Sequence, residues 1–481
     1  MSDSRPNILW ILCDELRTDA LSAYGNVHPE IRTPNIDRLA AMGAVFDQCF
    51  TASPVCVPAR TSLLTGRGPD ETGVYGNEAA ETVHPIADGL VAFTNVLSDA
   101  GWWTSDFGKE HLPESFSPWD HHDPDGASMK ELVAGTRESG ASITRTPGLG
   151  FAVAGVWPSN KDYPPARVTK NAISKMASSS QPFLVRASYL QPHTPVIVPE
   201  PWASHYSHVD FAGAPWRTPD TSDFEAAFAN INGGERMSRE DFQRAQVLYH
   251  GAVAWVDDQV GQLLDALEEL GLAGNTIIAL TSDHGAHLGD DGAYGKHTFA
   301  PVSHRVPLLI ADPARIAAGT RRSDLAHSTD FARTMLESCG VVVPDEIGGR
   351  DLVSGPAPEK IISVVGYGAA ASRAFPNKGV GKLDSTNGWP QRFCVRTQRF
   401  RLDMTTRING TIANPAQHDI FLADRLADPD ERINVARDPR YQDVRESLST
   451  ALLARAESAF RPDDASVYAS FVPPAGGSHG G

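Results

Sequence analysis

The sequence predicts an α/β protein, because apolar strand-like runs alternate with helical patterns up to about residue 360. Residues 7–14 and 275–285 are continuous apolar runs that end in acidic or histidine side chains, as expected of central parallel strands. Residues 182–195 form a third such run, which stops at a proline-bounded loop. We therefore expect a mixed, mostly parallel sheet flanked by helices.

The elements between these runs follow in order. A capped helix is predicted within residues 33–46, with one face formed by Ile36, Leu39, Ala40 and Gly43. Residues 89–101 predict a second helix, and residues 102–111 predict a strand that leads into a loop. Residues 196–238 are rich in proline, tryptophan, aspartate and glycine and predict loops over the site. Residues 240–270 predict a long amphipathic helix, because apolar residues follow helical spacing there: Tyr249, Val253, Val256, Val260, Leu263, Leu267 and Leu270.

Beyond residue 360 the pattern changes to strands in hairpin-like succession, followed by a helix near residues 440–459. This change predicts a smaller α+β subdomain over residues 360–470, after a larger catalytic domain over residues 1–359. The last segment, residues 471–481, is rich in glycine and proline and predicts a flexible tail.

Length and composition exclude several classes of protein. The 481 residues are 41% hydrophobic and 21% charged, without a transmembrane run, so we expect no membrane partner. The formal net charge of −17 argues against a nucleic-acid partner, and it requires a local cluster of positive groups for any anionic substrate. The start of the chain predicts a buried strand rather than a signal peptide. An odd number of scattered cysteines, without CxxC spacing, favours a reducing cytoplasm over a disulfide framework: Cys13, Cys49, Cys56, Cys339 and Cys394.

Residues 53–67, "SPVCVPARTSLLTGR", place Cys56 where a helix begins. Pro58 suits the first turn of a helix, because its missing N–H would have no partner there, and Gly66 is a suitable end. Cys56 would then lie at or just before the helix N-terminus, where free N–H groups favour negative charge. Taken alone, the same stretch favours a buried structural thiol, because free cysteines pack as small hydrophobic residues and are mostly inert.

Two groups of polar residues follow the predicted strands. Asp14, Asp283 and His284 offer two carboxylates and an imidazole at two strand ends, which together could hold a divalent cation. Aspartate and histidine also occur in glycine turns for local hydrogen bonding, so this motif alone has a structural interpretation. The second group is basic and could bind a tetrahedral anion: Arg60, Lys109, His111, His193 and Lys296. Each of these is individually consistent with a solvated surface or a turn, and only their joint occurrence points to a site.

Several stretches, in this order, resemble the type I sulfatases of the alkaline phosphatase superfamily. The "CVPAR" stretch matches the family signature C-x-P-x-R, and the resemblance covers nearly the whole chain. The other matching blocks are "RPNILWILCDE", "TPNIDRLAAMGAVFDQCFTASPVC", "FGKEHL", "QPHTP", "SDHG", "LGDDGAYGKH", "RVPLLI" and "ADPDERINVA". The resemblance implies an alkaline-phosphatase-like fold with a smaller C-terminal α+β subdomain.

The resemblance also implies a reason for Cys56. In this family a maturation enzyme converts the motif cysteine to formylglycine, whose aldehyde hydrates to a geminal diol. One hydroxyl attacks the sulfur of a sulfate ester and the alcohol leaves. Loss of the proton from the second hydroxyl then expels inorganic sulfate. A thiol or a serine has no second hydroxyl for this last step.

Roles for individual residues follow from the same resemblance. The metal ligands would be Asp14, Asp283, His284 and the modified residue 56, and Arg60 would offset the charge of the nucleophile. Lys109 and Lys296 would bind sulfate oxygens. His193, with Lys296, would donate a proton to the leaving oxygen, and His111 would be the base that releases sulfate. Asn77 would contact the sulfate or its ester oxygen, whereas His297 would support the loop.

The chain departs from the common family pattern at three places. Glu15 stands where many relatives have a second aspartate, and we leave it out of the metal shell because it is longer. The Asp283–His284 pair resembles the choline-sulfatase and phosphonate monoester hydrolase branches, which makes Mn²⁺ a competitor of Ca²⁺. Ser303 and His304 replace acidic residues, a change without an interpretation from the sequence.

Three functional hypotheses follow. The first is a sulfatase acting on an aryl or small alkyl sulfate ester. The second is a phosphonate monoester or phosphodiester hydrolase with the same machinery, which the Lys109-x-His111 pair disfavours because those hydrolases have tyrosine and threonine there. The third is an anion-binding protein in which Cys56 is not converted. A homo-oligomer stays open, and so does the identity of the alcohol.

Overall fold

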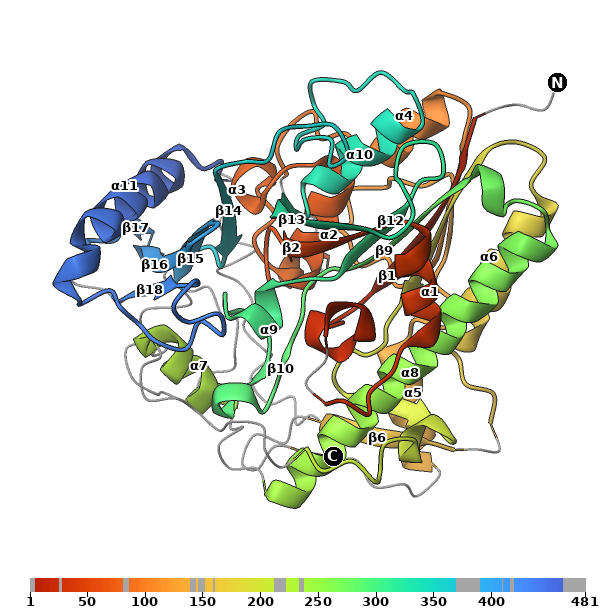
Figure 1. Cartoon of the computed structure of the whole chain (residues 1–481), viewed down its shortest axis with the longest axis horizontal. Coiled ribbons are helices and arrows are strands. Elements are labelled where there is room, and N and C mark those ends of the chain that lie inside the picture. The colour runs from red at the N-terminus through yellow and green to blue at the C-terminus, as the bar shows by residue number, and fades with distance from the viewer. Residues whose placement is uncertain are drawn as a thin grey trace.

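An eight-stranded sheet lies at the centre of the computed structural model of the chain (Figure 1). The structure describes residues 5–25, 28–80, 86–138, 144–145, 152–158, 161–211, 222–232, 238–368, 390–408, 410–415 and 419–461. The strand order is β13-β2-β12-β9-β1-β7-β3-β4. In chain order the strands are β1 (Asn7–Cys13), β2 (Ala44–Phe50), β3 (Trp103–Gly108), β4 (His121–Asp123), β7 (Phe183–Tyr189), β9 (Thr276–Ser282), β12 (Leu308–Ala311) and β13 (Thr320–His327). Only β12 runs antiparallel to its neighbours, so the prediction of a mixed, mostly parallel sheet is confirmed.

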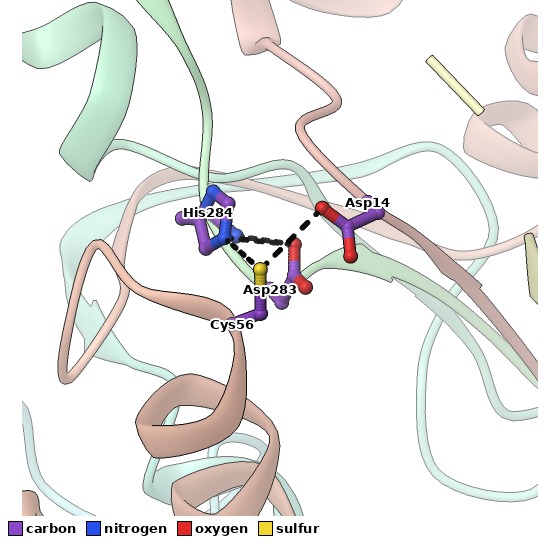
Figure 2. Close-up of side chains that lie close together, drawn as sticks. All are labelled: Asp14, Cys56, Asp283 and His284. Carbon is purple, nitrogen blue, oxygen red and sulfur yellow. Dashed lines mark hydrogen bonds and ion pairs between the residues drawn. The ribbon is translucent and has the colours of Figure 1, made fainter. Parts of the chain in front are cut away.

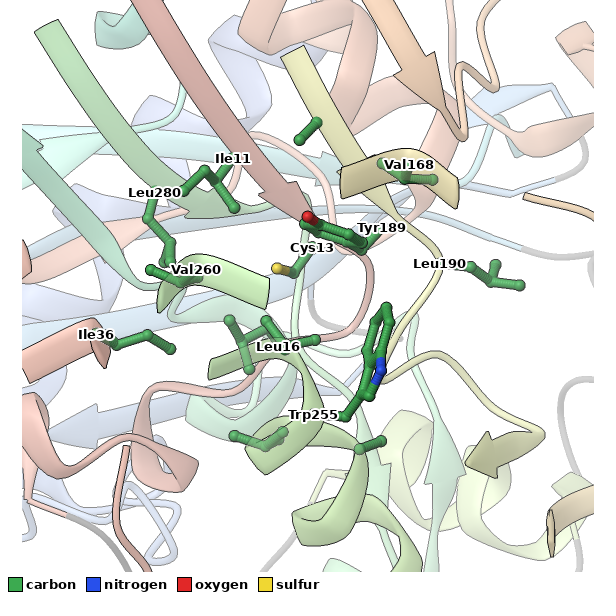
Figure 3. Close-up of a cluster of buried hydrophobic side chains, with 14 of the residues drawn as sticks. Ile11, Cys13, Leu16, Ile36, Val168, Tyr189, Leu190, Trp255, Val260 and Leu280 are labelled. Atoms are coloured by element: carbon green, nitrogen blue, oxygen red, sulfur yellow. The ribbon is translucent and has the colours of Figure 1, made fainter. Parts of the chain in front are cut away.

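Strand β1 shows how the sheet separates two hydrophobic cores. Leu9 and Ile11 belong to one core, whereas Ile8 and Trp10 belong to the core on the opposite face. Because both faces are buried, the strand is a continuous apolar run rather than an alternating one. Helices that contribute to the first core, part of which is drawn in Figure 3, are α1 (Pro34–Met42), α6 (Ala166–Ser178) and α8 (Arg239–Glu269). On the other face lie α2 (Cys56–Thr65), α4 (Phe93–Asp99) and α10 (Asp330–Ser338).

The prediction of loops throughout residues 196–238 was wrong in two segments. Strand β8 (Val196–Pro199) is fully buried and pairs in parallel with β6 (Ala152–Trp157), and α7 (Asp223–Asn232) is helical. The apolar "VIVP" run is too short to show a period, and its burial comes from the pairing with β6. The remaining small elements are α3 (Pro69–Thr72), α5 (Met129–Glu138), β5 (Thr144–Arg145), β10 (His287–Leu288), β11 (Tyr294–Gly295) and α9 (Pro301–His304).

A separate antiparallel sheet forms the C-terminal part, as expected. Its strands are β14 (Lys360–Val365), β15 (Gln391–Thr397), β16 (Phe400–Ile408), β17 (Thr411–Ile412) and β18 (Ile420–Asp424). Helix α11 (Gln442–Ser458) packs Leu452 and Ala456 against this sheet. The boundaries 1–359 and 360–470 stay predictions, and the predicted tail 471–481 lies outside the described residues. Within the described ranges, no helix combines the length and apolar character needed to cross a membrane.

A buried ion pair joins β15 to the segment after β18. Arg396 forms two hydrogen bonds with the Glu431 carboxylate, one of them Nη2 to Oε2 at 2.9 Å, and both side chains are buried. Burial alone would raise the pKa of Glu431, but Arg396 and Arg401 outweigh it and lower the pKa to about 2. The folded state therefore holds this carboxylate ionised.

We expect Glu431→Gln to lower the free energy of unfolding by about 3–5 kcal/mol at neutral pH, because it leaves Arg396 buried without a counter-charge. The native pKa of about 2 lies below the ordinary value of 4.5, so this stabilisation is complete above pH 4.5 and lost as the pH falls toward 2. The difference between wild type and variant, measured by urea denaturation at several pH values, should shrink over that range. Glu268→Gln removes the carboxylate of an exposed pair with Arg38 and should change little. Equal effects of the two substitutions would contradict the prediction.

Candidate active site

The carboxyl ends of four neighbouring strands meet at one edge of the sheet and carry most of the predicted site residues. Asp14 follows β1 directly, and Asp283 and His284 follow β9. Lys109 follows β3, and the loop after β7 carries His193. Lys296 comes from the short hairpin β10–β11, immediately after β11. The parallel arrangement therefore brings residues from distant parts of the sequence to one place.

Cys56 is the first residue of α2, as predicted from the sequence. The N-cap is Val55, and Asn77 Oδ1 accepts a hydrogen bond of 3.0 Å from the Val57 N–H, which would otherwise lack a helical partner. The helix ends at Gly66, whose φ of 70° is left-handed, and a Cβ there would lie 2.5 Å from the Gly348 carbonyl oxygen. Asn77 thus holds the helix end that presents Cys56, and its predicted sulfate contact stays a prediction.

Gly108 determines how the Lys109 loop leaves the sheet. Its φ is +100°, and a Cβ would lie 2.2 Å from the Ser188 carbonyl oxygen. The Lys109 N–H donates to that same oxygen at 2.9 Å, so β3 and β7 remain paired at the point where the loop begins. In the same loop His111, two residues after Lys109, adopts a left-handed φ of 53°. Only glycine at position 108 permits this close approach of the two strands.

Basic and acidic side chains surround the Cys56 thiol, and three of these neighbours, Asp14, Asp283 and His284, are drawn in Figure 2. Lys296 Nζ lies 2.9 Å from Sγ and His284 Nε2 lies 3.2 Å from it. Asp14 Oδ1 is 3.9 Å and Lys109 Nζ 4.0 Å from the sulfur, and interaction with the His111 side chain also lowers the pKa of the thiol. Cys56 has 1% of its surface exposed, so these groups rather than water surround it.

Arg60 lies one turn after Cys56 on α2 and is fully buried. Its Nη2 donates to Asp14 Oδ2 at 3.0 Å, and its Nε donates to Asp283 Oδ2 at 2.9 Å. The remaining hydrogen bonds of the guanidinium reach the Lys109 and Glu110 carbonyl oxygens and the Ser188 hydroxyl. Arg60 therefore contacts the two carboxylates next to Cys56 and offsets their charge, while its effect on residue 56 is electrostatic.

The electrostatic balance of the pocket favours an anion at residue 56. Burial alone would raise the pKa of the Cys56 thiol, but Lys109, Lys296 and His284 outweigh it and lower the pKa well below 9. Burial likewise opposes ionisation of Asp14, whose pKa nevertheless falls well below its ordinary value beside Lys109. Residue 56 therefore occupies a place suited to a negatively charged oxygen.

Asp14, Cys56, Asp283 and His284 form a group whose ligand atoms all lie within 4.8 Å of one another. Carboxylate oxygens and an imidazole suit Ca²⁺ or Mn²⁺, the histidine favouring the latter. Burial and Asp14 raise the pKa of Asp283 to about 6, and Asp283 raises that of His284 to about 9 against the effect of burial. The donor set thus fits a single divalent ion, whose positive charge would favour the deprotonated forms of Asp283 and His284.

Sequence reasoning left out two residues that the structure places in the pocket. Glu15 lies against His193 and Lys296, and the Ser188 hydroxyl bridges Arg60 and the Lys109 carbonyl oxygen. Glu15 is next to a predicted ligand, which was a usable signal, whereas Ser188 is an ordinary strand residue in the sequence. The backbone N–H of His297 donates to the Pro54 carbonyl oxygen at 3.2 Å, and the supporting role of its side chain stays a prediction.

Known proteins match this chain in sequence and in fold. The family profile described as Sulfatase matches residues 6–341. Human iduronate 2-sulfatase is 31% identical over 368 residues, which cover 69% of this chain and 64% of that protein. An arylsulfatase of Clostridium perfringens is 28% identical, with 72% of this chain and 78% of that protein covered. The phosphonate monoester hydrolase of Agrobacterium radiobacter shares the fold, with a TM-score of 0.72, 23% identity and coverage of 94% of this chain and 96% of that one. The chain belongs to the sulfatase family, whose members include sulfuric ester hydrolases.

Proposed function

We propose that this protein hydrolyses a sulfate monoester of an aryl or small alkyl alcohol, with formylglycine at position 56 supplying the nucleophile. The observation that carries the proposal is the convergence of Lys296, Lys109 and His111 on the Cys56 Sγ atom. A sulfate group transferred to residue 56 would carry negative charge at that place, and these donors would bind its oxygens.

Each polar side chain around residue 56 has a role in this proposal. Lys109 and Lys296 bind the sulfate oxygens, and His193 with Lys296 protonates the leaving oxygen. His111, in contact with residue 56, takes the proton whose loss releases inorganic sulfate. Asn77 holds the N-terminal end of α2 and contacts the sulfate group.

The proposed site includes one divalent cation, Ca²⁺ or Mn²⁺, held by Asp14, Asp283, His284 and residue 56. When bound, such an ion supplies Lewis-acid stabilisation of negative charge at the nucleophilic oxygen. Arg60 keeps the two carboxylates in place from the protein side, through its hydrogen bonds to Asp14 and Asp283. The residues of the chain thus orient both the ligands and the nucleophile.

Conversion of Cys56 also requires a maturation enzyme that reads the surrounding motif. Cys56 is 1% exposed, Arg60 is fully buried, and Pro58 is buried between them. Because no enzyme could reach these side chains in the folded chain, conversion has to precede the completion of folding. A reducing cytoplasm is part of the proposal, and the cysteines that the structure describes are all free.

The first experiment is mass spectrometry of the tryptic peptide that ends at Arg60, from protein made together with a formylglycine-generating enzyme. We expect residue 56 as the aldehyde or its hydrate, and we expect Cys56→Ala to abolish turnover of 4-nitrophenyl sulfate. An unmodified cysteine in turnover-competent protein would contradict the proposed nucleophile. Full activity of Cys56→Ala would have the same meaning, whereas lack of both modification and turnover would favour an anion-binding protein.

A second experiment separates the two hydrolase functions. We expect a higher kcat/KM for an aryl sulfate than for a phenylphosphonate monoester or a phosphodiester, because Lys109 and His111 both contact residue 56. The measurement is steady-state kinetics of one preparation on matched 4-nitrophenyl esters. A clear preference for the phosphonate would make the phosphonate monoester hydrolase function the better one.

A third experiment tests the metal site. We expect Asp283→Ala to weaken binding of Ca²⁺ or Mn²⁺ at least about 100-fold, because it removes a ligand and one partner of Arg60. Metal content after dialysis, measured by elemental mass spectrometry, reports the change. His122→Gln is the matched control, because His122 belongs to another group of close ligand atoms, with Asp106 and Glu110. We do not expect an ion in that group, because Asp106 already pairs with Arg186. Loss of the ion in His122→Gln but not in Asp283→Ala would place the metal site there instead.

A further inference from the structure

The Glu15 carboxylate faces the cationic side of the pocket rather than the four potential metal ligands. Its Oε1 accepts a hydrogen bond of 3.0 Å from Lys296 Nζ and lies 3.3 Å from His193 Nε2. Its Oε2 accepts a hydrogen bond of 3.0 Å from the Thr194 N–H, in the loop that carries His193. One carboxylate therefore contacts a lysine, a histidine and the backbone next to that histidine.

The backbone of Glu15 is held in the conformation that directs its side chain this way. Its φ of 63° lies in the left-handed region, which is uncommon for a residue other than glycine. The Glu15 N–H donates to Asp283 Oδ1 at 3.3 Å, and its carbonyl oxygen accepts a hydrogen bond of 2.7 Å from the Tyr249 hydroxyl. Contacts from β9 and α8 thus compensate an unfavourable local conformation.

Burial of a carboxylate costs desolvation free energy, and in a pocket that binds an anion the carboxylate also repels the ligand. Glu15 is 2% exposed, and its negative charge opposes the binding of a sulfate ester nearby. Its hydrogen bonds to Lys296 and to the loop that carries His193 instead keep Lys296 Nζ and His193 Nε2 within hydrogen-bond distance, 3.2 Å apart. The arrangement indicates that Glu15 keeps the Lys296 ammonium group and the His193 ring next to each other.

We propose that Glu15 is a positioning residue that holds Lys296 and His193 together as the proton donor to the leaving alcohol oxygen. This inference rests on the proposed sulfatase function. In that step a hydroxyl of residue 56 releases its proton to solvent and forms a new S–O bond, and the S–O bond to the alcohol breaks with its electron pair left on the alcohol oxygen. One proton moves from the Lys296–His193 pair to that oxygen, and the pair later regains a proton from solvent, which balances the one released by the nucleophile.

A metal-ligand role is the competing assignment for Glu15. Ligand atoms of Asp14, Glu15 and His193 also lie within 4.8 Å of one another. The ammonium group of Lys296 is hydrogen-bonded to Glu15 Oε1, however, and a second cation there would face this positive charge. Metal content and leaving-group dependence together separate the two assignments.

The test compares wild type and Glu15→Gln on sulfate esters whose alcohols differ in acidity, from 4-nitrophenyl sulfate to phenyl sulfate and a primary alkyl sulfate. For the poor leaving groups we expect kcat/KM to fall about 100-fold, because they need protonation. For 4-nitrophenyl sulfate we expect a fall of less than about tenfold, since its phenolate leaves without help. The variant should retain the metal content of the wild type.

Two further variants make the test decisive. His193→Ala should show the same selective loss, and the double variant with Glu15→Gln should lose little more than either single variant, as expected for residues that act as a unit. Glu15→Asp, one methylene shorter, should lie between wild type and Glu15→Gln and provides a second variant if the latter does not fold.

Three outcomes would overturn the proposal. Equal loss on all esters would show a merely structural role, and loss of the metal in Glu15→Gln would show a ligand role. A wild-type protein that turns over none of the sulfates would reject both this proposal and the sulfatase function. Wild-type turnover with equal losses would reject the role of Glu15 alone.

Discussion

The two ion pairs of Arg60 with Asp14 and Asp283 are the interaction on which the rest of the site depends. All three side chains are fully buried, and the pairs join α2 to the ends of β1 and β9. Buried charges are tolerated only when they are paired and hydrogen-bonded, because desolvation costs several kcal/mol per ion. Arg60 therefore supplies positive charge between the two carboxylates beside Cys56 and joins the helix to the sheet.

The same charge balance explains why cations surround residue 56. One guanidinium cannot neutralise both Asp14 and Asp283, and Lys109 provides a second positive charge through a hydrogen bond of 2.5 Å to Asp14. A divalent ion in the same place would complete the compensation. Glu15 extends the pattern on the other side of the pocket, where it balances Lys296. Positive and negative groups thus alternate around the nucleophile position.

His304, the last residue of α9, shows how the C-terminal sheet contacts the larger sheet's connecting segments. Its Nδ1 accepts a hydrogen bond of 3.0 Å from Arg396 Nε on β15, and its Nε2 lies 2.8 Å from the Ser363 hydroxyl on β14. Burial, together with Arg396, lowers the pKa of His304 well below its ordinary value, so the ring is neutral and can accept this hydrogen bond. An acidic residue in its place would form an ion pair instead. The sequence contained no signal for this partner, because Arg396 lies far along the chain.

The sequence by itself determined the strands that end in Asp14 and Asp283, the helix that begins at Cys56 and the mostly parallel sheet. These features depend on apolar runs, a proline and a glycine, which act locally and are visible in a short window. Only the tertiary structure decided the direction of Glu15, the partner of His304 and the pairing of β8 with β6. Each of these depends on contacts between distant segments and on the desolvation of charges between them. A linear pattern encodes neither, since it specifies which groups are present but not which of them meet out of contact with water.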